Sequence, residues 1–287
     1  MRKNLIDLSE KIDKSRLEAI EAIANVADAL DIPFFIIGAS ARDLILLNGY
    51  DIATIRATLD IDFGVRVPNW DQYEKLKQSL LNTDEFALTE ESQRFKYQNK
   101  LFIDLIPFGP IAGKDNIIKW PPSQEIVMHT LGFEESFRNA QSVRLRSNPV
   151  LDVRIVTLAG LALMKIISWK DKYPERSQDA SDLALIIQKY TDAGNFKRIL
   201  NEEPDLLDSE DFDYVRAGAR LLGRDIAKLL NLETKNEILE ILHRETGDQD
   251  RYRLIEDMMK SDTGIIQDFE TVLDLLEELR AGILERT

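Results

Sequence analysis

The stretch Thr58-Leu59-Asp60-Ile61-Asp62-Phe63 alternates apolar and acidic side chains, and the interpretation of the chain depends on it. Successive side chains of a β-strand point to opposite faces, so Asp60 and Asp62 share one face. Two carboxylates at this spacing repel each other, and a divalent cation between them relieves the repulsion. We interpret the stretch as a metal-binding strand, with a solvent-facing edge strand as the alternative. The opposite face, directed at the core, carries Leu59, Ile61 and Phe63.

A third acid interrupts a later apolar run, Phe102-Ile103-Asp104-Leu105-Ile106. A carboxylate in such a strand is costly unless it is paired or liganded. Together with Asp60 and Asp62, Asp104 predicts a site for two Mg²⁺ ions about 4 Å apart, as in two-metal phosphoryl transfer. The alternative is that Asp104 caps a turn.

A glycine turn precedes the acidic strand, in Ile37-Gly38-Ala39-Ser40-Ala41-Arg42-Asp43. Here an apolar strand ends, glycine lets the backbone turn, and a helix begins at once. Free amide groups at a helix N-terminus bind phosphate, and a serine hydroxyl adds a donor. Gly38, Ser40 and Arg42 are therefore candidate nucleotide-binding residues. In isolation, Ser40 is better explained as a helix N-cap, and the acidic strand that follows favours phosphate binding.

The composition of the chain limits the partners and the metal sites that it can have. The 287 residues carry 37 Lys and Arg against 51 Asp and Glu, a net charge of −14, which excludes a protein that coats nucleic acid by bulk charge. The absence of cysteine excludes disulfides, cysteine-ligated zinc and thiol chemistry. Two histidines, His129 and His243, are too few for a histidine-built metal site, and we interpret His129 as structural. A bound metal is thus expected to be a hard ion held by carboxylates.

The pattern along the chain predicts an α+β fold: a mixed sheet flanked by helices, followed by an all-helical region. We place a catalytic domain at 1–156 and a helical domain at 157–287. No apolar run reaches the length of a membrane span, and the N-terminus does not resemble a signal peptide, so we expect a cytoplasmic protein. The segments expected are a helix at 10–30, a strand at 58–67, a hairpin turning at 98–100, helices at 157–173 and 175–190, an acidic solvated connection at 202–213 and a helix at 266–284.

Lys165 lies among apolar residues at helical spacing, including Leu161 and Trp169. Burying a lysine ammonium among apolar residues is unfavourable unless an anion pairs with it. The side chain can also extend to the edge of the core. Asp182 on the next predicted helix is a candidate to orient Lys165 or to contact a nucleotide. Asp179, three residues earlier, is expected to pair with Arg176.

These residues resemble the nucleotidyltransferase superfamily that includes polymerase beta and the CCA-adding enzymes. The similarity lies in the glycine turn at 38–43, the Asp60-Ile61-Asp62 strand and the later Asp104. Further along, the chain resembles AbiEii-like nucleotidyltransferases, the toxin-type enzymes of bacterial abortive infection. That resemblance rests on Leu161-Ala162-Leu163-Met164-Lys165, Trp169-Lys170-Asp171, Arg176 and Asp179-Ala180-Ser181-Asp182-Leu183.

The resemblance implies transfer of a nucleoside monophosphate from an NTP to an acceptor hydroxyl, with release of pyrophosphate. It implies that Asp60 and Asp62 bind both Mg²⁺ ions and that Asp104 binds the catalytic one and helps to deprotonate the acceptor. Gly38 and Ser40 would hold the β- and γ-phosphates, and Lys165 would neutralise charge there. The helical domain would then complete the nucleotide site.

The acceptor is open at this point. The resemblance implies tRNA or another RNA, in a toxin–antitoxin or antiphage-defence role. Alternatives are template-independent synthesis of short oligonucleotides as a defence signal, adenylylation of a small molecule such as an aminoglycoside, or a non-catalytic nucleotide-binding regulator. The acidic helical C-terminus is a possible surface for a protein partner or a dimer. A basic stretch that either guides the acceptor or triphosphate or forms a solvated face contains Arg138, Arg144, Arg146 and Arg154.

Overall fold

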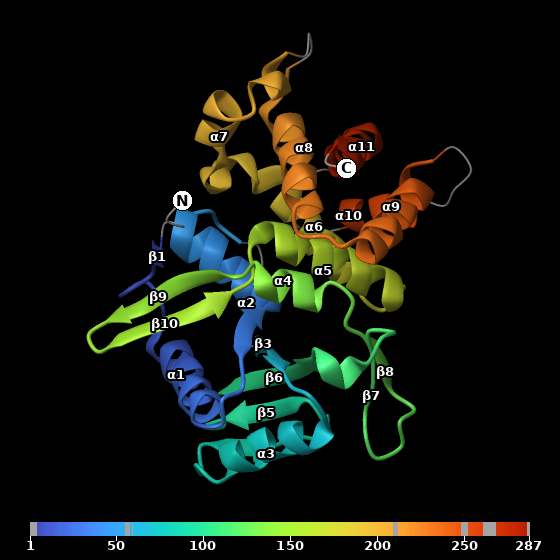
Figure 1. Cartoon of the computed structure of the whole chain (residues 1–287). Coiled ribbons are helices and arrows are strands. Elements are labelled where there is room, and N and C mark those ends of the chain that lie inside the picture. The colour runs from blue at the N-terminus through green and yellow to red at the C-terminus, as the bar shows by residue number, and fades with distance from the viewer. Residues whose placement is uncertain are drawn as a thin grey trace. The chain divides into compact units, whose positions relative to one another are not determined.

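The structure is a computed structural model that describes residues 5–54, 58, 60–208, 212–247, 252–260 and 268–285. The predicted inward direction of Leu59 and the predicted start of the last helix at residue 266 lie outside these ranges. The chain divides into two compact units, Met1–Thr157 and Leu158–Thr287 (Figure 1). None of the helices within the described ranges has both the length and the apolar character needed to cross a membrane.

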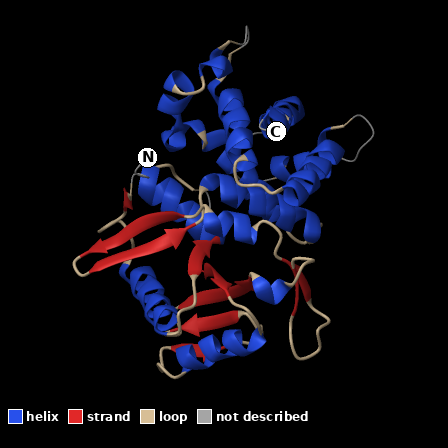
Figure 2. Cartoon of the chain, viewed as in Figure 1, coloured by secondary structure: helices blue, strands red, loops and turns tan. Residues whose placement is uncertain are grey.

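The first unit is built on an eight-stranded mixed sheet with the order β1-β9-β10-β2-β3-β6-β5-β4 (Figure 2). At its centre, β3 pairs antiparallel with β2 and parallel with β6. The strands are β1 (Ile6–Asp7), β2 (Phe34–Ile37), β3 (Asp60–Arg66), β4 (Phe86–Leu88), β5 (Arg94–Tyr97), β6 (Leu101–Phe108), β9 (Gln141–Ser147) and β10 (Val150–Ile155), with β7 (Ile117–Lys119) and β8 (Val127–His129) in a separate two-stranded sheet.

Helices flank this sheet, as predicted. The sequence accounts for their ends: Asp13 and Asn69 cap α1 and α3 by accepting hydrogen bonds from backbone amides of the first turn. The helical segments are α1 (Lys14–Ala29), α2 (Gly38–Asp43), the π-helical η1 (Leu44–Gly49), α3 (Trp70–Leu81), the 3-10 turn η2 (Pro110–Ala112) and α4 (Phe133–Arg138).

One face of the sheet is a continuous apolar layer. Ile61 and Phe63 of β3 and Ile103 and Leu105 of β6 alternate with polar positions and are fully buried. The α1 and α3 helices contact each other and pack on this side, where the hydroxyl of Tyr73 donates to the carbonyl of Leu105 at 2.9 Å. The predicted alternation of Asp60-Ile61-Asp62-Phe63 is therefore a consequence of burying this face.

The opposite face is divided into an aromatic half and an acidic half. Phe35 and Phe108 meet Phe137 of α4 with ring centroids 5.5 and 5.4 Å apart, which closes one end of the face. The other end, where β3 and β6 begin, carries Asp60 and Asp104. The aromatic half of the face is therefore packed against α4, whereas the acidic half carries charged side chains.

The second unit is helical throughout its described part. Its α8 and α11 cross closely because Gly223 and Gly282 lie at the contact: a Cβ on Gly282 would stand 2.0 Å from the carbonyl oxygen of Arg220. The segments are α5 (Leu158–Asp171), α6 (Ser177–Lys189), η3 (Thr191–Asn195), α7 (Phe196–Asn201), η4 (Pro204–Leu207), α8 (Tyr214–Ala227), α9 (Leu232–Thr246), α10 (Arg253–Met259) and α11 (Phe269–Glu285).

The prediction of a solvated connection at 202–213 is wrong for part of its length. Pro204–Leu207 forms a 3-10 turn whose Leu206 is buried. Glu203 and Asp205 both bind the guanidinium of Arg224, which is buried and also meets Glu285 at 2.7 Å. Glu203 and Asp205, which the sequence predicts to be solvated, are held in place because the buried guanidinium of Arg224 requires carboxylate partners.

Candidate active site

The acidic half of the sheet face is organised by strand register. Asp62 of β3 stands directly opposite Asp104 of β6, and Asp60 stands opposite Phe102. On the other side of β6, Arg94 of β5 stands opposite Asp104. Opposed residues point to the same face, so Asp62, Asp104 and Arg94 form one row across three strands.

The glycine turn closes against this row. Gly38 follows β2 with a φ of +67°, a conformation that side-chain-bearing residues rarely adopt. A Cβ at Gly38 would lie 2.0 Å from the Oδ2 atom of Asp62, so only glycine allows the turn and this carboxylate to approach so closely. The turn and the Asp62 side chain therefore form one small cradle.

Ser40 and Arg42, the other two residues predicted to bind the nucleotide, are directed into the interior of the unit. The buried Ser40 hydroxyl donates to the backbone carbonyl of Asp60 at 2.5 Å, which ties the turn to the start of β3. The buried guanidinium of Arg42 binds the neighbouring Asp43, with its Nε 2.9 Å from Oδ1. In this structure both side chains position the turn.

Arg94 is the site residue that the sequence analysis missed. Its Nε and Nη2 atoms donate to Asp104 Oδ1 and Oδ2 at 2.8 and 2.6 Å, and Nη2 also meets Asp60 Oδ2 at 3.2 Å. The hydrogen bonds to Asp104 raise the pKa of Arg94 above its ordinary value. The predicted hairpin was sufficient to identify Arg94 as a neighbour of Asp104, because a turn at 98–100 places the two residues opposite each other.

Three carboxylates on one face have the oxygen donors that Mg²⁺ prefers. The set fits a divalent ion in donor type. Its side chains are nevertheless arranged around Arg94: across the ranges that the structure describes, no three His, Cys, Asp or Glu side chains are grouped as a metal site. Asp60 also accepts a hydrogen bond from the Thr58 hydroxyl at 2.8 Å.

The second unit holds a separate ionic cluster around Lys165. Its Nζ lies 2.6 Å from Asp179 Oδ1 and 2.6 Å from Asp182 Oδ2, and only 13% of the lysine side chain is exposed. Burial lowers the pKa of Lys165, but the two carboxylates outweigh burial and raise it above 10.5. Asp179 thus pairs with Lys165 more closely than with Arg176, which stands 3.8 Å away.

The basic stretch of the first unit is occupied by internal contacts. Arg144 binds Asp152 through two hydrogen bonds of 2.8 and 2.9 Å, and Arg146 binds Glu21 of α1. The guanidinium of Arg154 lies 4.1 Å from the centre of the Phe137 ring. These three arginines serve the packing of β9 and β10, which matches neither a guide for an anion nor a solvated face. Arg138, the fourth, is exposed and pairs with Glu134 at 3.1 Å.

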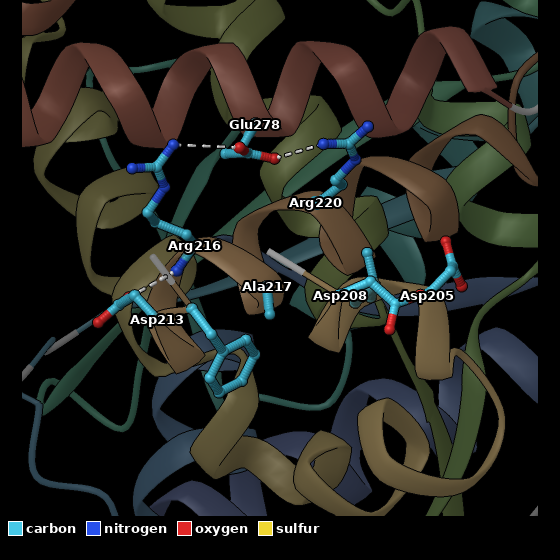
Figure 3. A pocket seen from close by; sticks show the side chains of 9 residues that line it. Asp205, Asp208, Asp213, Arg216, Ala217, Arg220 and Glu278 are labelled. Carbon is cyan, nitrogen blue, oxygen red and sulfur yellow. Dashed lines mark hydrogen bonds and ion pairs between the residues drawn. The ribbon is translucent and has the colours of Figure 1, made fainter. Parts of the chain in front are cut away.

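The second unit also contains a cavity of about 260 Å³ beside α8 and α11. Figure 3 shows Glu278 between the guanidinium groups of Arg216 and Arg220, at 3.4 and 3.1 Å. The other charged side chains that line it are Asp205, Asp208 and Asp213. Because carboxylates outnumber arginines in this lining, the cavity does not suit a triphosphate.

Searches of protein-family models and of curated proteins found no match for the chain. Among solved structures, the antibiotic-resistance factor ANT(2'')-Ia is similar at 12% identity and a TM-score of 0.37, over 69% of this chain and 97% of that one. The lincosamide antibiotic adenylyltransferase LnuA matches at 12% identity and 0.36, over 61% of this chain and 98% of its own.

A third similar structure is the Thermotoga maritima CCA-adding enzyme complexed with tRNA, at 13% identity and a TM-score of 0.27. That match covers 97% of this chain and 83% of the enzyme. Similarity at this level assigns no activity, so the activity must be argued from the side chains of this chain.

Proposed function

We propose that the protein is a metal-dependent nucleotidyltransferase that moves a nucleoside monophosphate from an NTP to an acceptor hydroxyl. The observation that carries the proposal is the acidic half of the sheet face. There, Asp60, Asp62 and Asp104 share one face of two neighbouring strands, and the Gly38 turn closes against Asp62. Carboxylates grouped in this way supply the kind of oxygen donors that a divalent cation takes.

The reaction is an in-line displacement at the α-phosphorus of the NTP. The acceptor oxygen forms the new bond to phosphorus, the bond to the bridging oxygen breaks, and pyrophosphate leaves. The protein contributes positioning and electrostatic stabilisation, as phosphoryl transfer generally requires. Bound Mg²⁺ supplies charge neutralisation on the phosphate oxygens and favours the alkoxide form of the acceptor.

Each carboxylate has a distinct task in this proposal. Asp60 and Asp62, two residues apart on β3, hold divalent metal against the sheet face. Asp104, directly opposite Asp62, completes the ligand set and accepts the proton of the acceptor hydroxyl. Gly38 lets the turn approach the Asp62 carboxylate closely, and Ser40 and Arg42 hold the turn that Gly38 begins.

For the acceptor we propose the end of an RNA, such as tRNA, in a toxin or defence role. The support for this is the resemblance of the 161–183 segment to AbiEii-like enzymes. Synthesis of short oligonucleotides is the alternative product. An acidic chain with net charge −14 is expected to hold a polyanion weakly, because contacts to phosphates dominate such affinity.

The experiment is incubation of the full chain with each α-labelled NTP and dNTP and Mg²⁺, with and without total tRNA, followed by a denaturing gel. Labelled tRNA is the expected product, whereas a ladder without added RNA indicates oligonucleotide synthesis. The double variant Asp60→Asn with Asp62→Asn is expected to give no label while its circular dichroism spectrum is unchanged. Undiminished labelling by that variant contradicts the proposal.

A further inference from the structure

Arg94 stands on β5 beside Asp104, at one end of the row that also contains Asp62. The part of the sheet face that carries Asp60, Asp62 and Asp104 is called the acid face below. Its guanidinium binds both oxygens of Asp104, at 2.8 and 2.6 Å, and one oxygen of Asp60, at 3.2 Å. A planar guanidinium fork matches a carboxylate geometrically, which makes this two-bond pairing specific to arginine. One cation therefore engages acids on two strands at once.

The acid face needs a positive charge whether or not a metal is bound. Asp104 is buried, and Asp62 lies directly across from it on the neighbouring strand. Carboxylates this close destabilise one another in the ionised form unless a cation is present. Arg94 supplies that cation, but it does so through oxygen atoms of Asp60 and Asp104 that a metal ion would use.

Arg94 also contacts two groups outside the acid face, and these remain available to it if a metal takes its place on Asp60 and Asp104. Its Nη1 atom lies 3.6 Å from Oε1 of Glu91, an exposed acid three residues earlier. Its guanidinium carbon lies 5.4 Å from the centre of the Phe102 ring, within the range of a cation–π contact. A quarter of the Arg94 side chain is exposed, so movement toward Glu91 or Phe102 does not require the strand to open.

We propose that Arg94 is a displaceable cation that competes with the divalent metal for Asp60 and Asp104. This rests on the proposed function of the acid face. While Arg94 contacts Asp60 and Asp104, only a minor fraction of the molecules has these carboxylates free to bind metal. The apparent affinity for metal is lowered in proportion to that fraction. Arg94 thus holds the acid face together before metal arrives and sets the concentration at which metal enters.

The test is a titration of the full chain with Mn²⁺ in the absence of nucleotide, followed by electron paramagnetic resonance of the free ion. Arg94→Gln removes the competing charge, and we expect it to bind Mn²⁺ about tenfold more tightly or better than wild type. Arg94→Lys keeps the charge but loses the fork, and we expect an intermediate affinity. Thermal melting of each variant in EDTA checks that it is folded.

Lys96→Gln is the matched control. Lys96 is on the same strand and the same face, two residues away, and its ammonium lies 5.9 Å from the Phe102 ring centre. Its substitution removes one positive charge without touching Asp60 or Asp104. We expect its Mn²⁺ affinity to stay within about twofold of wild type, since a half-buried charge that does not bind the acids is partly screened.

The outcomes separate this inference from the proposed function. If wild type binds Mn²⁺ and Asp62→Asn does not, but Arg94→Gln binds no more tightly than wild type, competition by Arg94 is wrong and the proposed function stands. Equal tightening in Lys96→Gln and Arg94→Gln also overturns the inference, since charge alone then explains it. If no form binds Mn²⁺, the proposed function fails and this inference fails with it.

Discussion

Two clusters, one in each unit, place a basic side chain between two carboxylates and differ in burial. Lys165 contacts Asp179 and Asp182 with 13% of its side chain exposed, whereas Arg94 contacts Asp60 and Asp104 with 25% exposed. The lysine cluster comes from two packed helices, and the arginine cluster from three neighbouring strands.

The difference in burial suggests different roles for the two clusters. Removing a cation from buried carboxylates is strongly unfavourable, so Lys165 is expected to stay in place. Arg94 lies at a more open face with Glu91 and Phe102 near it, which allows its exchange for another cation. A fixed cation serves stability, and an exchangeable one serves a binding site.

The largest expected loss of stability is in Lys165→Met. This change leaves Asp179 and Asp182 buried without their cation, and we expect the free energy of unfolding to fall by about 3–5 kcal/mol. Urea denaturation of the full chain measures it. Lys170→Met is the control on the same helix: its side chain is 48% exposed and pairs with Glu237, so we expect a loss under about 1 kcal/mol. Equal losses in the two variants contradict a structural role for Lys165.

The next effect is at the glycine turn. Gly38→Ala forces a strained φ and places a methyl group against Asp62, so we expect a loss of about 2–4 kcal/mol together with weaker Mn²⁺ binding. Gly113→Ala separates the two causes, because Gly113 has a φ of +66° and nothing within 4 Å of the added carbon. If the free energy of unfolding falls equally in both alanine variants, the close approach of Gly38 to Asp62 contributes nothing to stability.

In EDTA, we expect Arg94→Gln to lower the free energy of unfolding by about 1–3 kcal/mol, which is less than Lys165→Met. The reason is that water can reach part of the space around Asp60 and Asp104 that the guanidinium fills in the wild type. Saturating Mn²⁺ should restore most of that loss, since a ligand that binds the folded state stabilises it. The measurement is the urea midpoint with and without Mn²⁺. A loss equal to that of Lys165→Met would remove the distinction between the two clusters.

The smallest effect is in the pH dependence. The raised pKa of Lys165 means that its stabilising contribution is complete below its ordinary pKa of 10.5 and is lost as the pH rises above it. With ¹³C-labelled lysine side chains, the Cε signal of Lys165 is assigned by its loss in Lys165→Gln, and we expect it to keep its protonated position at pH 11. A Lys165 signal already shifted at pH 11 would contradict the pairing of Lys165 with Asp179 and Asp182.

The sequence predicts the parts of the acid face that depend on neighbouring residues. Alternation in 58–63 predicts a strand with Asp60 and Asp62 on one face, and the hairpin turn at 98–100 agrees with the observed pairing of Tyr97 with Leu101. The pairing of Arg94 with Asp104 follows from that same register. Whether Arg94 would extend toward Asp104 or toward solvent depends on side-chain packing that register alone does not determine.

The parts that the sequence does not predict depend on distant contacts. Spacing within one helix favoured pairing of Asp179 with Arg176, but the packing of α5 on α6 brings Lys165 closer. The two-residue strand β1 pairs with β9, more than a hundred residues away, and has no local pattern of its own. Neither contact can be derived from periodicity, because both depend on how separate elements meet.

Release of pyrophosphate by the full chain tests the central claim most directly. The assay contains Mg²⁺, total tRNA and one NTP at a time, and compares wild type with Asp62→Asn and with Lys96→Gln. We predict several turnovers per chain for wild type and Lys96→Gln with at least one NTP, and only background release for Asp62→Asn. Release by Asp62→Asn at the wild-type rate, or none by wild type with any NTP, would contradict a catalytic role for the acid face.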